Sequence, residues 1–280
     1  MRITCWGARG SVSVSGPDYV VYGGETTCLE VRGPTGELLI LDAGTGIRRL
    51  GNRLIKEGQV EATILFTHAH WDHITGFPFF KPLFRESSKL KIICCAFTPE
   101  FVRQMLANTM AAPYFPVPLA KVQAQLSYPE IAAQPFQVAG LEITSIPISH
   151  PNGGSGYKLS QDGKTFVFLT DNELGHRHPG GLPLGAYQDF CQAADLLIHD
   201  AEYTPQEYAN GFKGYGHSTF TEALELAISA KVKKFGLFHH NQDRTDEQVE
   251  SMVAACQRRV LEAGSDLEVW AVRSGQTTEL

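Results

Sequence analysis

Four short apolar runs in this sequence each end directly in polar side chains. The runs are Ala62–Phe66, Thr165–Leu169, Leu196–Ile198 and Phe235–Phe238. Continuous apolar runs of this length are typical of strands that are buried on both faces. Since each run delivers its polar residues at its carboxyl end, we expect these residues to gather at one edge of layered sheets.

Helices are predicted between these strands. Thr219-x-x-Glu222 and Thr245-x-x-Gln248 have the form of capping boxes, and the second precedes apolar residues at helical spacing. Strands packed as sheets with amphipathic helices outside predict a layered α/β architecture. Residues 108–138 show no clean period and are predicted to form a lid or insertion beside the site.

The composition predicts a globular protein, and we expect one domain over residues 1–280. The net charge of −6 argues against extended nucleic-acid binding and against an anionic membrane surface. No apolar run is long enough to span a bilayer, and Met1–Trp6 lacks the apolar core of a signal peptide. The six cysteines form no C-x-x-C pair, which favours reduced thiols and a cytoplasmic location.

The densest cluster of ligand-type side chains follows the first apolar run. His68, His70, Asp72 and His73 lie within six residues. A loop leaving a strand can turn His68 and His70 toward one point while Asp72 and His73 reach a second. Imidazole nitrogens and carboxylate oxygens are the ligands that Zn²⁺ and similar divalent cations prefer. A solvated polar loop is the alternative, and so many ligands directly after a strand disfavour it.

The other histidines extend this pattern. None of the ten lies in an amphipathic helical pattern or in the middle of a predicted strand. For His239-His240 we favour one ligand and one supporting residue. For His176 and His178, a solvated loop and substrate contact are equally open.

With these motifs in place, the chain resembles the metallo-β-lactamase superfamily. The motifs are, in order, Leu41–Gly46, His68–His73, Ser149-His150, Thr170-Asp171 and Leu237–His239. The resemblance implies an αββα four-layer sandwich, with two mixed sheets flanked by helices and a dinuclear metal site at one edge of the sheets.

The resemblance also implies a ligand set. One metal would be held by His68, His70 and His150, the second by Asp72, His73 and His239, with Asp171 as the bridging carboxylate. The expected cofactors are two divalent metal ions, with Zn²⁺ as the default and Mn²⁺ or Fe²⁺ as alternatives. Asp42 is expected to order the metal loop rather than to bind metal.

Within the superfamily, the chain looks most like the phosphodiesterase branch that includes ribonuclease Z. Ala194–His199 and His217-Ser-Thr219 resemble motifs of that branch, and the loops at 7–11 and 22–27 resemble those of small bacterial hydrolases within it. Position 200 is Asp where ribonuclease Z usually has Glu, and no long basic arm for transfer RNA is visible. A homodimer is open, because members of the branch commonly form dimers.

The predicted reaction is hydrolysis of a small anionic phosphodiester, such as a 3′,5′-cyclic nucleotide or another cyclic phosphate, by a metal-bridging hydroxide. Asp72 and Asp171 would position the nucleophile. His217 would serve as general acid or as a donor to the phosphate, oriented by Asp200 or His199. Weaker candidates for substrate contact are Arg9, His176, His240 and Tyr114.

Several other functions remain open from the sequence. A ribonuclease would need a basic groove that leads to the metals. A lactam, lactone or thioester hydrolase would leave His217 without a phosphate to serve. A diiron redox protein usually carries Glu in place of the second histidine, and His70 argues against it. A metal-bound sensor or binding module is the non-enzymatic alternative.

Overall fold

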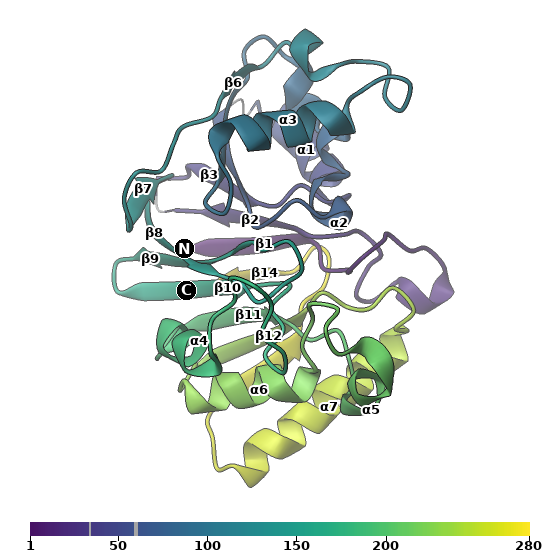
Figure 1. Cartoon of the computed structure of the whole chain (residues 1–280), viewed down its shortest axis with the longest axis vertical. Helices are drawn as coiled ribbons and strands as arrows, with labels where there is room; N and C mark the ends of the chain where they lie inside the picture. The colour runs from purple at the N-terminus through teal and green to yellow at the C-terminus, as the bar shows by residue number, and fades with distance from the viewer. Residues whose placement is uncertain (34, 59–60) are drawn as a thin grey trace.

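Two seven-stranded mixed sheets pack face to face in the computed structural model, and helices cover the outer face of each sheet (Figure 1). The structure describes residues 1–33, 35–58 and 61–280. The strand order is β14-β1-β2-β3-β4-β5-β6 in one sheet and β13-β12-β11-β10-β9-β8-β7 in the other. The αββα sandwich implied by the sequence motifs is confirmed.

The first sheet is built mainly from the first half of the chain. Its strands are β1 (Arg2–Gly7), β2 (Cys28–Arg32), β3 (Leu38–Leu41), β4 (Glu61–Phe66), β5 (Lys89–Cys94), β6 (Gln125–Ser127) and β14 (Thr277–Glu279). The last strand returns to pair antiparallel with β1, so the two ends of the chain meet in this sheet (Figure 1).

The second sheet follows from the middle of the chain onward. Its strands are β7 (Phe136–Val138), β8 (Leu141–Pro147), β9 (Ser155–Gln161), β10 (Lys164–Leu169), β11 (Leu196–Asp200), β12 (Lys234–Phe238) and β13 (Glu268–Ala271). Strands β10 to β13 run parallel, and so β10, β11 and β12 deliver their carboxyl ends to the same edge of the sheet.

The helices lie in two outer layers (Figure 1). Above the first sheet lie α1 (Ile47–Glu57), α2 (Trp71–Ile74) and α3 (Pro99–Thr109), and below the second lie α4 (Leu184–Cys191), α5 (Pro205–Glu207), α6 (Phe220–Ser229) and α7 (Asp246–Glu262). Both predicted capping boxes are present, at Thr219 before α6 and at Thr245 before α7. Among the described residues, no helix is long and apolar enough to cross a membrane.

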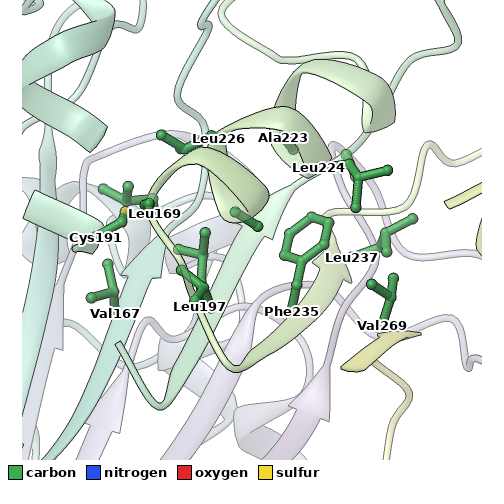
Figure 2. Packing of buried hydrophobic residues seen from close by; sticks show 14 of the residues in the cluster. Val167, Leu169, Cys191, Leu197, Ala223, Leu224, Leu226, Phe235, Leu237 and Val269 are labelled. Atoms are coloured by element: carbon green, nitrogen blue, oxygen red, sulfur yellow. The ribbon is translucent and has the colours of Figure 1, made fainter. Parts of the chain in front are cut away.

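Three buried apolar layers hold the sandwich together. One lies between the two sheets, a second packs α1 and α3 on the first sheet, and a third packs α4, α6 and α7 on the second sheet. In the third layer, Val167, Leu197 and Phe235 of the sheet face Ala223 and Leu226 of α6 (Figure 2). All three apolar runs that form β10, β11 and β12 are therefore buried on both faces, as the sequence predicted.

Two details differ from the sequence prediction. Strand β11 extends through His199 and Asp200, which were expected to follow the strand, and His73 lies in the short helix α2. In the segment 108–138, the pieces that form β6 and β7 are edge strands of the two sheets. The role of residues 108–138 as a lid or insertion beside the site stays a prediction.

The end of β4, which precedes the histidine cluster, is tied to the second sheet by two hydrogen bonds. The Tyr157 hydroxyl donates to the Phe66 carbonyl at 2.6 Å, and the Ser155 amide donates to the Thr67 carbonyl at 2.9 Å. Tyr157 is fully buried in the layer between the sheets. These bonds set the position of the loop at 68–73 relative to the second sheet.

We expect Tyr157→Phe to lower the free energy of unfolding by ~1–2 kcal/mol, because a buried carbonyl loses its donor. Denaturant unfolding followed by fluorescence measures the change. The matched control is Tyr114→Phe, since Tyr114 is 88% exposed, and that variant should stay within ~0.5 kcal/mol of the parent. Equal stability of the two variants would show that the Tyr157 hydroxyl contributes nothing.

Candidate metal centre

The polar residues that follow the strands converge at one edge of both sheets. Asp42 and His239 come directly after β3 and β12, and Asp171 is the second residue after β10. All three have left-handed backbone, with φ of 60°, 57° and 53° in that order. Asp and His are among the few residue types that adopt this region at modest cost. The turn of the chain at each strand end thus directs these side chains inward, and strained backbone is often found at functional sites.

The first group of ligand atoms joins His68, His70, His150 and Asp171. Their atoms lie within 4.8 Å of one another. His68 Nε2 is 3.5 Å from Asp171 Oδ2, and His150 Nε2 is 3.7 Å from the same oxygen. His70 Nδ1 lies 2.9 Å from His150 Nε2, so two ring nitrogens face the same point.

The second group joins Asp72, His73, Asp171 and His239, again within 4.8 Å. His239 Nε2 lies 3.0 Å from Asp72 Oδ2 and 3.4 Å from Asp171 Oδ2. His73 Nε2 lies 3.3 Å from an oxygen of each carboxylate. Asp171 belongs to both groups, and its carboxylate lies between them. The structure thus brings together all seven residues that the sequence proposed as ligands.

Carboxylate and carbonyl oxygens around the centre accept hydrogen bonds from the Nδ1 atoms of three of the histidine rings. His73 Nδ1 donates to Asp42 at 2.8 Å, and His239 Nδ1 donates to Glu202 at 2.9 Å. His150 Nδ1 donates to the Gly216 carbonyl at 2.8 Å. With these nitrogens protonated, each ring turns the lone pair of its Nε2 toward the centre, as ligand histidines require.

Thr67 and Ser11 complete this support. The Thr67 hydroxyl donates to Asp42 at 2.8 Å and lies 3.0 Å from His68 Nδ1, so it links two of the rings. The Ser11 amide donates to Asp72 at 2.9 Å from the loop after β1. In the same loop, a Cβ on Gly10 would lie 2.3 Å from the His239 ring, so only glycine fits there.

The electrostatics of the centre follow from this arrangement. Burial alone would raise the pKa of Asp72 and Asp171, and the surrounding histidines instead hold both well below the ordinary value. Burial lowers the pKa of His150 to about 4 and that of His68 well below its ordinary value. The rings of His68 and His150 are therefore neutral at physiological pH and can donate a lone pair to a cation.

Two buried ring nitrogens test whether a metal fits. Nε2 of His68 and Nε2 of His73 are buried and make no hydrogen bond among the described residues, although carboxylate oxygens lie 3.3–3.5 Å away. A buried polar atom without a partner is costly and calls for an explanation. Divalent cations at the two groups would bind these nitrogens and balance the buried carboxylates. The residues present therefore fit a pair of divalent metal ions.

His217 lies beside the second group, with its ring stacked on His239 at a centroid distance of 4.7 Å. Its Nδ1 lies 3.1 Å from Asp200 Oδ2 and 3.4 Å from Glu202 Oε2. Burial would lower the pKa of His217, and the Glu202 and Asp200 carboxylates instead raise it to about 9. Asp200, rather than His199, orients this ring, because His199 turns toward Asn172 and the backbone of Asp200.

Glu202 is a site residue that the sequence analysis missed. It is 2% exposed, and together with His217 and His239 it forms a third group whose atoms lie within 4.8 Å of one another. Within that group His239 Nδ1 already donates to Glu202, whereas its Nε2 faces Asp72 of the second group. We therefore interpret the third group as hydrogen-bonded support. Its signal in the sequence is weak, since Glu202 simply follows the Asp200 strand end by two residues.

Arg9 and His240 were expected near the substrate, and the structure places both in the interior. The Arg9 guanidinium is fully buried and donates to the carbonyls of Gly23, Asn241 and Arg244 at 2.9–3.3 Å. His240 is 2% exposed, its Nε2 donates to the Val272 carbonyl, and burial lowers its pKa to about 3. Both side chains therefore donate hydrogen bonds that connect distant segments of the backbone.

The other two weak candidates lie on the surface. His176 is exposed and packs its ring against His178, whose Nε2 bonds to Glu173 at 2.7 Å. Tyr114 lies in the segment between α3 and β6. No contact joins either of them to the ligand residues in the described part of the chain, and their substrate contacts stay predictions.

An αββα sandwich with this His/Asp cluster at the sheet edge defines the class of metallo-β-lactamase-fold hydrolases, and this chain is an enzyme of that class. Residues 38–240 match the family described as the beta-lactamase superfamily domain. That match covers most of the chain, and the protein belongs to this family.

Relatives and solved structures agree with this assignment. The chain is 27% identical over 289 residues to ribonuclease Z of Thermococcus gammatolerans, covering 86% of this chain and 88% of the relative. It shares its fold with the metallo-β-lactamase fold protein YhfI from Bacillus subtilis (TM-score 0.71, 17% identity, 100% and 98% covered). It also shares its fold with a diphosphatase from the PhnP family (TM-score 0.68, 18% identity, 100% and 97% covered).

We expect Glu202→Gln to weaken metal affinity ~10–100-fold, as changes in groups that support ligand histidines do. The substitution removes the charge that faces His239 Nδ1 and leaves the ligand set intact. Titration against a chromophoric chelator measures the affinity. The matched control is Glu225→Gln, since Glu225 is half exposed and pairs with Arg259 on the surface. Unchanged affinity in Glu202→Gln would contradict the supporting role.

Proposed function

We propose that this enzyme is a phosphodiesterase that cleaves a small anionic substrate, such as a 3′,5′-cyclic nucleotide or another cyclic phosphate. The observation that carries the proposal is the placement of His217. Its ring stacks on the ligand residue His239, and Asp200 holds its inner nitrogen. A histidine held in this orientation beside the metal ligands suits a general acid, which donates a proton to the oxygen that leaves phosphorus.

We further propose that the seven ligand residues hold two Zn²⁺ ions, with Mn²⁺ or Fe²⁺ able to occupy the same donors. Such ions lower the pKa of bound water to about 7 and neutralise charge on phosphoryl oxygens. Their holders would be His68, His70 and His150 for one ion and Asp72, His73 and His239 for the other, with Asp171 shared.

The residues around the ions would divide the remaining work. Asp72 accepts from the Ser11 amide and lies against His239 through Oδ2, and its other oxygen would orient an attacking water. His217 Nδ1 lies against Asp200, which would leave Nε2 to face the substrate. As the P–O bond breaks, Nε2 would donate its proton to the leaving oxygen, and each such acid–base role is typically worth ~10²–10⁴ in rate.

Ribonuclease activity is the second candidate, because several of the relatives are named ribonuclease Z. The net charge of −6 weighs against it, since gripping a structured RNA depends on basic surface. A carbonyl substrate such as a lactam or thioester would leave His217 and Asp200 without a leaving oxygen of this kind.

The first experiment is a substrate panel on metal-loaded protein. We expect hydrolysis of bis(p-nitrophenyl) phosphate and of a cyclic nucleotide, little or no turnover of a lactam or thioester, and no processing of a precursor transfer RNA. His68→Ala should lose activity on every substrate, because it removes a ligand. Turnover of the thioester or lactam without phosphodiesterase activity would overturn the proposal, and efficient RNA processing would favour the second candidate.

The second experiment separates His217 from the metal ligands. We expect His217→Ala to retain two metal ions per chain and to lower kcat ~10²–10⁴-fold on a phosphodiester with an alkyl leaving group. Elemental analysis and steady-state kinetics on the same sample measure both quantities. Loss of metal from His217→Ala would show that this ring is a ligand and not the acid.

A further inference from the structure

The metal centre is most exposed to solvent at His70. Six of the seven ligand residues are buried, and His70 is half-buried. The ring of His70 lies 4.7 Å from that of His150, and the ring of His150 lies 5.2 Å from that of His217. We therefore expect a substrate to approach the cluster beside His70, near the residues that flank His150 and His217.

Residues 208–217 form one of these flanks. The segment begins with an irregular turn, Tyr208–Phe212, whose backbone is not helical at Asn210 and Gly211, and it ends at His217. Gly216 packs directly on His150, since a Cβ there would lie 2.0 Å from the His150 ring, and its carbonyl accepts from that ring. The residues just before Gly216 thus lie at the rim of the centre.

A buried carboxylate fixes this segment. Glu173 is 1% exposed and accepts from the Tyr208 hydroxyl at 2.5 Å and from the amides of Gly214 and Gly216 at 2.7 Å. Gly214 and Gly216 have φ of 89° and 97°, which glycine adopts without strain. The side chains of the segment are therefore presented on a backbone that is held in place.

Two of those side chains, Phe212 and Tyr215, form a row of three aromatic rings together with Tyr203, which precedes the segment. Phe212 stacks on Tyr203 with centroids 4.8 Å apart, and Tyr203 lies 6.0 Å from the His217 ring. Tyr215 meets Phe212 at 5.8 Å with the planes inclined by 65°. Tyr203 is buried behind the other two, whereas Phe212 is 41% and Tyr215 62% exposed.

Tyr203 covers one face of the Phe212 ring, and both Phe212 and Tyr215 keep a large exposed surface. Neighbouring exposed apolar side chains often mark a site where a ligand or a partner binds. A planar heterocycle can stack on one ring and meet the edge of the other, which aromatic geometry favours.

We propose that Phe212 and Tyr215 form a stacking platform for the base of a nucleotide substrate, so that the phosphodiester substrate is a nucleoside phosphate. The inference rests on the proposed phosphodiesterase function and adds the substrate class. The phosphate would lie at the metal centre beside His217, and the base would lie over the rim formed by residues 212–215.

The test compares two five-membered cyclic phosphates, adenosine 2′,3′-cyclic phosphate and glycerol 1,2-cyclic phosphate, which differ by the base and most of the sugar. In the double variant Phe212→Ala/Tyr215→Ala, the ratio of kcat/KM for the adenosine substrate to that for the glycerol substrate should fall at least about fivefold. That change corresponds to ~1 kcal/mol, the lower end for one base–aromatic stack. The loss should lie mainly in KM. Leu261→Ala, an exposed apolar truncation at the end of α7, should leave the ratio unchanged.

A binding measurement makes the test independent of turnover. By calorimetry on metal-loaded protein, the double variant should bind adenosine 5′-monophosphate at least about fivefold more weakly, with a smaller change for ribose 5-phosphate. If the parent enzyme hydrolyses neither cyclic phosphate, the proposed function fails while this binding comparison still decides the platform. An unchanged ratio with unchanged binding would overturn the platform. Dissociation of a dimer in the double variant, with both comparisons unchanged, would do the same and assign the rings to a subunit contact.

Discussion

The Asp171 carboxylate is the contact on which the site depends. It lies after β10 of the second sheet, within 3.3–3.7 Å of ring nitrogens of His68, His73, His150 and His239. Two of these rings follow β4 of the first sheet and two belong to loops of the second. The centre therefore exists only if the two sheets pack at one particular offset. Buried bonds between the sheets, such as the one from Tyr157 to Phe66, maintain that offset.

Burial of so many ionisable groups lowers the stability of the folded state. Hydrogen bonds to these groups and the apolar layers of the sandwich offset that loss. Buried carboxylates are tolerated when they are paired and fully hydrogen-bonded. Asp42 and Glu202 meet this condition through Thr67, His73, His239 and Asn241. The apolar layers on both faces of each sheet supply the stability, and the polar atoms are confined to the edge where the strands end. This division lets the sandwich carry a charged centre without interrupting its core.

The sequence predicted those parts of the site in which metal-ligand side chains directly follow an apolar run. Apolar runs that end in His68–His73, Asp171 and His239 were sufficient to predict the strands and the first candidate ligands, and the resemblance to the metallo-β-lactamase superfamily supplied the full candidate set. Glu202 and Glu173 could not be found in this way, because their partners come from distant segments and only the packed fold places them beside a histidine or an amide. Left-handed backbone at Asp42 is equally invisible in one sequence. Arg9 and His240 were expected to contact the substrate because they lie beside motifs in the sequence. In the structure both side chains donate hydrogen bonds to backbone carbonyls.

The centre and its flank suggest a division of labour along the chain. Residues that follow strands supply the candidate ligands, whereas the segment before α6 supplies His217 and the exposed rings that would select the substrate. A change of substrate would then need changes in residues 208–217 and none in the ligand set, which accords with a fold that hosts many activities.

The account stands or falls on whether the seven ligand side chains bind a pair of cations. The most direct measurement is the metal content of the purified, folded protein after loading and removal of free ions, taken together with anomalous diffraction from crystals of the same sample. The account predicts two divalent ions per chain, one in contact with His68, His70 and His150 and the other with Asp72, His73 and His239. A folded protein that retains none, or one that holds ions only at other residues, would contradict it.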